Sequence, residues 1–143
     1  DGKELNGLFP ELSELLKVCT QSCILDGQIM VRDKEGKPLH KELSGRLTKQ
    51  SSQPAVLIVS DVLSIGGKDV VKERLQKRKE LLEALILPSI RILKTVFIEE
   101  HGKQFYESVA MRGFDGVIGK NLSSLYHTGM RTRDWLVVRA PKK

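Results

Sequence analysis

Ala55-Val56-Leu57-Ile58-Val59 is an uninterrupted apolar run that begins directly after the polar breaker Ser51-Ser52-Gln53-Pro54. A run of this length, bounded by proline and rich in β-branched residues, is typical of a strand that is buried on both faces. The sequence therefore predicts a buried β-strand over residues 55–59. The segments on either side must supply the layers that cover it.

The segment before this strand predicts two short helices and a second strand. Pro10 stands in the first turn of a helix expected over residues 10–16, where leucines recur three and four apart. Residues 23–31 alternate loosely between apolar and polar side chains and end in a turn at 33–36, as a strand does. A second short helix is expected over residues 41–49.

The segment after the strand predicts a turn at Gly66-Gly67 and then the longest helix, over residues 71–87, which Pro88 ends. A strand, a helix and two further strands are predicted over residues 90–98, 100–111, 116–119 and 135–138. Helices laid between strands at uneven spacing predict an α+β fold, in which helices pack on an antiparallel-rich sheet.

Composition indicates one globular domain over residues 1–143, with 40% hydrophobic and 29% charged residues. No apolar run approaches the ~20 residues that cross a bilayer, and the N-terminus lacks a signal-peptide pattern, so we expect an intracellular protein without a membrane partner. The net charge of +6 favours a polyanionic partner such as nucleic acid.

The two cysteines, Cys19 and Cys23, lie four residues apart. This spacing suits a metal site only if further ligands are close, and none of the three histidines lies within ten residues of the pair. We therefore expect two buried free thiols.

Residues 72–79 carry five basic side chains, which could follow a DNA backbone. Glu73, Glu80 and Glu83 interleave with them, and this mixture is more typical of a solvated helix face.

Four separated motifs lie along nearly the whole chain. The first is Asp1-Gly2-Lys3-Glu4-Leu5 with Phe9-Pro10-Glu11-Leu12, and the second is Leu25-Asp26-Gly27-Gln28 followed by Gly36, Leu43 and Arg46. The third is Ser60-Asp61-Val62-Leu63 with Gly67, Leu75 and Arg78. The fourth is Phe114-Asp115-Gly116-Val117-Ile118-Gly119-Lys120 with Ser124, Tyr126, Gly129, Arg131 and Trp135. In this order, the motifs resemble those of ATP-dependent DNA ligases, in particular the ligase module of the bacterial and archaeal ligase D group.

The resemblance implies part of a nucleotidyl-transferase (adenylation) domain that uses ATP and Mg²⁺ to seal nicked double-stranded DNA in repair and end joining. In this family the lysine of a Lys-x-Asp-Gly motif attacks the α-phosphate of ATP and stores AMP for transfer to the nick. By the resemblance, that motif would lie upstream of Asp1, so we expect no catalytic nucleophile in this chain and no self-adenylation. By the same resemblance, an oligonucleotide-binding-fold domain would complete the enzyme. We expect the protein in the cytoplasm of a bacterium or archaeon, associated with the nucleoid.

The resemblance also implies roles for individual residues. Arg46 and Lys120 match nucleotide contacts, Lys120 at the α-phosphate, and Gln28 and Ser60 stand at two further nucleotide-binding positions. Asp115 matches a metal-binding carboxylate and Arg131 a DNA-facing arginine. The alternatives are solvated surface positions for Arg46, Lys120 and Arg131. Trp135, a lone tryptophan in an apolar strand, is expected to pack on the sheet.

Five positions depart from the family pattern. Gln28 replaces a carboxylate, Ser60 replaces the aromatic residue that stacks on adenine, and Asp115 replaces glutamate. Val137 and Arg139 replace two lysines. These changes leave two alternatives open, a divergent ligase or a non-catalytic DNA- or partner-binding module with a decayed nucleotide pocket. An RNA ligase or an mRNA-capping enzyme is a third, which the first and fourth motifs disfavour.

The resemblance has a consequence for assembly. Because the first strands of the domain would precede Asp1, we expect an exposed sheet edge, through which two copies could form a homodimer.

Overall fold

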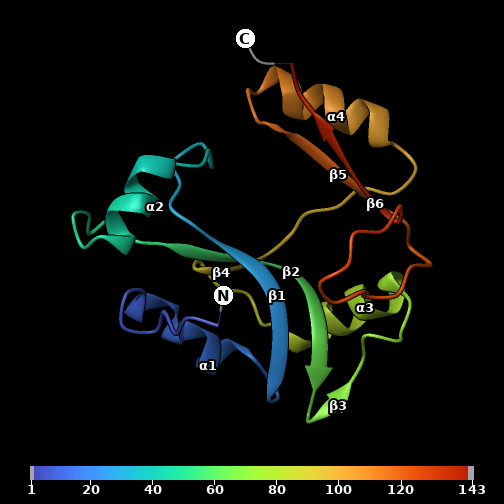
Figure 1. Ribbon diagram of the computed structural model, residues 1–143, viewed down its shortest axis with the longest axis horizontal. Helices are drawn as coiled ribbons and strands as arrows, with labels where there is room; N and C mark the ends of the chain where they lie inside the picture. Colours follow the sequence, from blue (N-terminus) through green and yellow to red (C-terminus); the bar gives the residue numbers. More distant parts are fainter. Residues whose placement is uncertain (1, 142–143) are drawn as a thin grey trace.

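A computed structural model describes residues 2–141 and contains two β-sheets with helices packed around them (Figure 1). The strands are β1 (Cys23–Met30), β2 (Val56–Ile65), β3 (Lys68–Asp69), β4 (Ile92–Lys94), β5 (Gly116–Lys120) and β6 (Trp135–Arg139). The helices are the 3₁₀ helix η1 (Pro10–Glu14) and the α-helices α1 (Leu15–Val18), α2 (His40–Leu47), α3 (Leu75–Leu85) and α4 (Gly102–Met111).

Strand β2 is the centre of the first sheet. It pairs antiparallel with β1, from Cys23 opposite Ile65 to Met30 opposite Val56, and parallel with β4. The β2–β3 hairpin turns at Gly66-Gly67, where both φ angles are positive (57° and 78°). Such angles are characteristic of the type I′ turn, whose twist matches that of the flanking strands.

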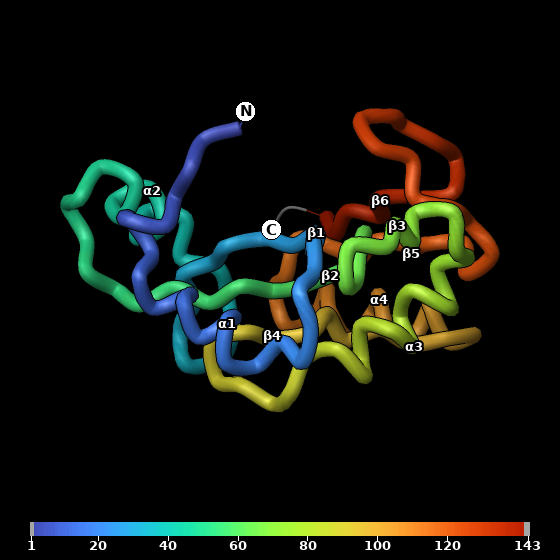
Figure 2. The backbone as a smooth tube through the Cα atoms, turned by 90° about the horizontal axis from the view of Figure 1, so that it is seen from below, coloured from blue at the N-terminus to red at the C-terminus, as the bar shows by residue number. Residues whose placement is uncertain are grey.

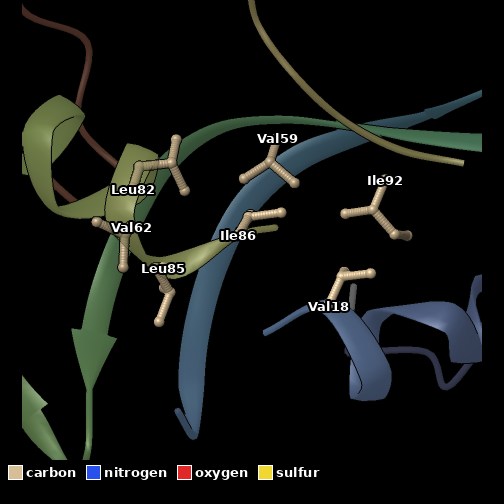
Figure 3. Close-up of a cluster of buried hydrophobic side chains, with 7 residues drawn as sticks. All are labelled: Val18, Val59, Val62, Leu82, Leu85, Ile86 and Ile92. Carbon is tan, nitrogen blue, oxygen red and sulfur yellow. The ribbon is translucent and has the colours of Figure 1, made fainter. Parts of the chain in front are cut away.

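The main core lies between β2 and the helix α3. Seven buried apolar side chains meet there, namely Val18, Val59, Val62, Leu82, Leu85, Ile86 and Ile92 (Figure 3). The buried residues of α3 (Leu75, Arg78, Leu82 and Leu85) recur at three- and four-residue spacings, so one stripe of the helix faces the sheet. A second cluster of Phe9, Val31 and Ala55 holds the N-terminal segment against the sheet.

Strands β5 and β6 form a separate antiparallel sheet, with α4 packed against β5. Figures 1 and 2 agree in placing this unit on the opposite side of the molecule from α2. In the register of this sheet Lys120 lies opposite Trp135 and Ile118 opposite Val137, so these four side chains share one face. Both Ile118 and Val137 are exposed.

The α+β fold is therefore confirmed, while several boundaries differ from those that we predict from sequence. The predicted helix 71–87 begins only at Leu75, because the preceding backbone makes other hydrogen bonds: Tyr126 N–H donates to Val71 O, and Leu75 N–H to Ser124 O. It ends at Leu85, because Ile86 is extended and bridges Cys19.

The predicted strand over residues 90–98 was wrong in extent. Only Ile92–Lys94 pairs with β2, and Val96, Phe97 and Ile98 are exposed. By contrast, the strand predicted over 55–59 continues to Ile65 as β2, and of its first residues Leu57 and Ile58 are only partly buried.

Candidate nucleotide-binding site

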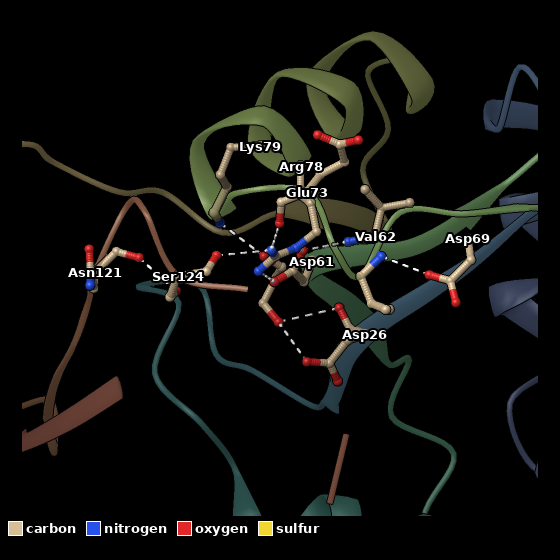
Figure 4. A network of polar contacts seen from close by, with 11 residues as sticks. Asp26, Asp61, Val62, Asp69, Glu73, Arg78, Lys79, Asn121 and Ser124 are labelled. Atoms are coloured by element: carbon tan, nitrogen blue, oxygen red, sulfur yellow. Dashed lines mark hydrogen bonds and ion pairs between the residues drawn. The ribbon is translucent and has the colours of Figure 1, made fainter. Parts of the chain in front are cut away.

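A buried ion pair joins the two halves of the site (Figure 4). Arg78 of α3 donates from Nε and Nη2 to the two carboxylate oxygens of Asp61 on β2, at 2.8 and 2.9 Å, and neither side chain is exposed. Its Nη1 donates to Glu73 O at 2.5 Å and to Ser124 O at 3.2 Å. One guanidinium thus ties β2, the start of α3 and the loop after β5 together.

An aromatic stack leads from this pair to Lys120. The Arg78 guanidinium lies 5.8 Å from the centre of the Tyr126 ring, and Tyr126 meets Trp135 edge to face with ring centres 5.7 Å apart. The ammonium of Lys120 lies 3.6 Å from the centre of the Trp135 ring, a cation–π contact. The stack places a cation at the end of β5, facing the first sheet.

The environment of Lys120 disfavours its charge. Burial lowers its pKa below the ordinary 10.5, the carboxylates of Asp61 and Asp26 act in the opposite direction, and Arg78 lowers it further. A partly desolvated ammonium of this kind interacts strongly with an incoming anion, because little water screens it.

Lys79 is a second cation beside Lys120. Its ammonium donates to Ser60 O at 2.9 Å and lies 5.1 Å from the centre of the Phe97 ring. Burial lowers the pKa of Lys79, and the charge of Lys120 lowers it further. The prediction of a solvated face over residues 72–79 was therefore wrong for Arg78 and Lys79, although Lys72, Arg74 and Lys77 are exposed.

Strand β1 supplies the acidic side of the site. Ser60 Oγ donates to Asp26 O at 3.3 Å and approaches Asp26 Oδ2 at 3.5 Å. Burial raises the pKa of Tyr126, and the charge of Asp26 and a hydrogen bond to it raise the pKa further. Asp26, Ser60 and Tyr126 therefore converge with the two lysines.

Gln28 and Asp115 line a neighbouring hollow of about 430 Å³. The other lining residues come from β1 and from the segment that leads into α2, namely Ile29, Met30, Val31, Pro38, Leu39, His40 and Leu43. Asp115 directly precedes β5 and Lys120 ends it, so the two residues lie roughly 16 Å apart along the strand. The structure therefore brings Asp115 near Gln28, whereas Lys120 lies near Lys79, Asp26 and Asp61.

The protein side chains alone do not form a complete magnesium site, but Asp115 together with the phosphates of a bound nucleotide fits a magnesium ion. Within residues 2–141 no group of three or more His, Cys, Asp or Glu side chains is placed to hold a metal ion. Magnesium is commonly bound by one or two carboxylates together with substrate phosphates, and Asp115 can supply one such carboxylate.

Arg46 stands apart from this group. Its Nη1 and Nη2 reach the two carboxylate oxygens of Glu11 at 2.9 and 3.0 Å, and they also donate to Gln53 O and to Leu8 O. Its guanidinium lies 5.1 Å from the centre of the Phe9 ring. In this arrangement Arg46 fastens α2 to the N-terminal segment, and a nucleotide contact by Arg46 stays a prediction.

Arg131 and Trp135 complete the residues singled out from sequence. Arg131 is exposed in the loop before β6, where a DNA contact stays a prediction. Trp135 is half-buried and lies between Tyr126 and Lys120. The expectation that Trp135 packs on the sheet did not include its contact with the Lys120 ammonium.

Sequence reasoning missed Lys79 and gave no role to Tyr126, Asp61 or Arg78. The available signal was the third motif, which places Asp61 next to Ser60 and Arg78 three residues after Leu75.

Two solved structures share this fold. The ligase domain from M. tuberculosis LigD superposes with a TM-score of 0.76 and 24% identity, over 96% of this chain and 45% of that chain. A mycobacterial DNA ligase D complexed with ATP and MES gives a TM-score of 0.75 and 24% identity, over 95% and 44%. The chain thus has the fold of a ligase nucleotidyl-transferase domain, of which it represents a part.

The sequence of the chain assigns the family. Residues 2–139 match the model of the ATP dependent DNA ligase domain, so the chain belongs to that family. Its relatives include a DNA ligase of Methanothrix thermoacetophila (26% identity over 96% of this chain) and probable DNA ligases of Streptomyces coelicolor (29% over 95%) and Saccharopolyspora erythraea (30% over 96%).

The chain spans only 27%, 29% and 28% of the lengths of these three relatives. Among the residues that the structure describes, no helix is long and apolar enough to span a membrane.

Proposed function

We propose that this chain forms the nucleotide-binding part of an ATP-dependent DNA ligase, which seals nicks in double-stranded DNA during repair and end joining. The observation that supports the proposal most directly is the position of Lys120, which lies over Trp135, near Asp26 of β1 and Asp61 of β2 and beside Lys79. Two partly desolvated cations at one place suit the phosphate groups of a nucleotide.

In this proposal each side chain binds or orients the nucleotide. Lys120 contacts the α-phosphate, and its low hydration strengthens that contact. Lys79 reinforces the positive potential while its hydrogen bond to Ser60 O fixes its position. Ser60 and Gln28 offer hydrogen-bonding groups to the base and ribose, where the family has an aromatic residue and a carboxylate.

Magnesium enters the proposal through Asp115. The ion, when bound with ATP, neutralises phosphate charge and stabilises the pyrophosphate leaving group. Asp115 would hold the ion through one carboxylate, together with the bound nucleotide. The lysine nucleophile and an oligonucleotide-binding-fold domain belong to parts of the ligase outside these residues.

Arg131 faces nicked DNA in this proposal. It is exposed on the loop before β6, and the basic character of the chain, with a net charge of +6, favours the DNA backbone.

Calorimetric titration of ATP with Mg²⁺ into the chain tests the proposal. Lys120→Ala should weaken binding at least about tenfold, because a charged hydrogen bond contributes about 1.5–3 kcal/mol. Lys77→Ala is the matched control, since Lys77 is exposed and pairs with Glu80 on the surface of α3. Equal affinities of the wild-type chain and Lys120→Ala would contradict the assignment of Lys120.

A second candidate function is a non-catalytic DNA- or partner-binding module. The observation that favours it is the engagement of Arg46 by Glu11, Leu8 and Gln53, which removes one family nucleotide contact from the site. Fluorescence anisotropy with nicked DNA, measured over a range of salt concentrations, separates the two functions. The test uses a longer chain that contains the Lys-x-Asp-Gly motif. If this longer chain binds DNA in a salt-dependent way but neither binds ATP nor seals nicks, the non-catalytic module is supported.

A further inference from the structure

Cys19 and Cys23 bring their sulfur atoms together at the beginning of β1. Cys19 directly follows α1 and Cys23 is the first residue of β1, and their Sγ atoms lie 3.7 Å apart. Both thiols are free and half-buried, at the edge of the main core. The expectation of free thiols is confirmed, whereas that of full burial was wrong.

The backbone holds both ends of the short loop between these cysteines. On one side Cys19 bridges Ile86, and Thr20 N–H donates to Leu85 O at 3.0 Å. On the other side Cys23 pairs with Ile65, and Gly66 N–H donates to Ser22 O at 2.7 Å. These contacts come from α3 and from β2, so the approach of the sulfurs is fixed by the tertiary fold and not only by the sequence spacing.

The pair lacks the further ligands that a metal site needs. Within the part of the chain that the structure describes, no third metal-ligating side chain completes a group with them. The two sulfurs lie 3.7 Å apart, and a disulfide bond would bring them to about 2.05 Å. We propose that Cys19 and Cys23 form a dithiol redox site that reacts with low-molecular-weight disulfides of the glutathione type and closes an intramolecular disulfide.

The reaction proceeds by two thiol–disulfide exchanges. The thiolate of Cys23 attacks one sulfur of the small disulfide, which forms a mixed disulfide and releases one small thiol after protonation. The thiolate of Cys19 then attacks Sγ of Cys23 and releases the second small thiol. The two protein thiols lose two electrons and two protons in total, and the small disulfide takes up both.

The order of attack follows from the surroundings of Cys19. Burial, together with the neighbouring Cys23 thiol, raises the pKa of Cys19 to about 11, so Cys19 is protonated at neutral pH. A thiol of this kind reacts slowly with a reagent from solution. Its attack on Cys23 is intramolecular, and there the short distance compensates for the small thiolate fraction.

Closure would act on a strand that carries site residues. The disulfide would fasten the end of α1 to the first residue of β1, three residues before Asp26. The test below counts thiols in the absence of ATP, so its outcome does not depend on the proposed ligase function.

The experiment incubates the 143-residue chain in buffers with several ratios of oxidised to reduced glutathione, both folded and unfolded in urea. Free thiols are then alkylated and counted by mass spectrometry. The folded chain should lose both thiols together, with an equilibrium constant for closure at least about tenfold above that of the unfolded chain. By linkage, the oxidised chain should also melt at a higher temperature than the reduced chain.

Matched variants distinguish closure from simple thiol capture. Cys19→Ser should stop at one glutathione adduct, because its remaining sulfur has no internal partner. An equilibrium constant in the folded chain equal to or below that in urea would overturn the proposal. Two glutathione adducts on the folded wild-type chain would overturn it as well.

Discussion

Arg78 and Asp61 form a fully buried ion pair, and the loss of either partner should destabilise the chain strongly. Neither side chain has contact with water, and the pair shares two hydrogen bonds. Arg78→Met leaves the Asp61 carboxylate buried without its partner, and we expect a loss of roughly 3–5 kcal/mol in the free energy of unfolding. Urea denaturation measures this loss.

Two further variants make that prediction specific to the pair. Asp61→Leu combined with Arg78→Met should lose less stability than the two single losses added, because no uncompensated charge remains. Lys77→Met, on the exposed side of the same helix, should change little. Strict additivity of the two buried substitutions would contradict the coupling.

Glu11 gives a prediction about acid stability. Burial alone would raise its pKa, but hydrogen bonds from Arg46 and from Ala55 N–H outweigh burial and hold the pKa below the ordinary 4.5. A carboxyl group with a pKa lower in the folded than in the unfolded state stabilises the fold above the unfolded value, and loses that contribution as the pH falls through the folded value. The stability difference between wild type and Glu11→Gln should therefore be constant near neutral pH and shrink below about pH 4.5. Urea midpoints across pH measure it, and a difference independent of pH would count against the pair.

At the scale of elements, Gly27 permits the close pairing of β1 with β2. A Cβ atom there would lie 2.6 Å from Ile58 O and 3.1 Å from Val59 Cα, both backbone atoms of β2. Gly27→Ala should therefore separate the strands and destabilise the chain by about 1–3 kcal/mol. Gly7→Ala is the control, since a Cβ atom at Gly7 meets no heavy atom within 4 Å. Thermal unfolding of the two variants provides the comparison, and equal melting temperatures would refute the close approach.

The sequence predicts these elements well where local chemistry decides them. The apolar run at 55–59, the glycine pair at 66–67 and the proline at position 10 each mark an element that the structure contains. The predicted boundaries of elements are wrong where a distant backbone group takes the hydrogen bonds at the end of the element. The N–H of Leu75 donates to Ser124 O, 49 residues away, and no local sequence pattern predicts that contact.

The same distinction applies to the site. Family motifs single out both Lys120 and Ser60, which lie in different sheets, and their roles in nucleotide binding stay predictions. Lys79 is hidden within a run of charges that resembles a solvated surface, and only the packing of α3 on β2 reveals it. The contact of Arg46 with Glu11 links residues 35 apart, which likewise no spacing rule predicts.

At the scale of the whole molecule, β1 leaves one edge of the first sheet open. Within residues 2–141 it pairs only with β2. We propose that two copies of the chain pair through this edge, since unpaired strand edges are templates for association. Size-exclusion chromatography with light scattering should show a dimer at high concentration.

A charge placed on the edge strand tests that dimer. Ile24→Lys, at a residue of β1 that is 60% exposed, should shift the chain to monomer, whereas Leu16→Lys, at an 86% exposed residue outside the sheets, should not. A wild-type chain that elutes as a monomer at every concentration would exclude this pairing.

The contacts of the Arg78 guanidinium also imply an order of assembly. Its bond to Asp61 closes a loop of only 17 residues, while its bond to Ser124 closes one of 46. Short closures cost less chain entropy and form earlier, so β2 and α3 can dock before the C-terminal strands arrive. When the chain is synthesised from its N-terminus, Asp61 and Arg78 also emerge well ahead of Ser124. The Arg78 side chain therefore takes part in both an early and a late step of folding. Once it is bound to Asp61, its guanidinium can still donate to Ser124 O when the C-terminal part of the chain folds.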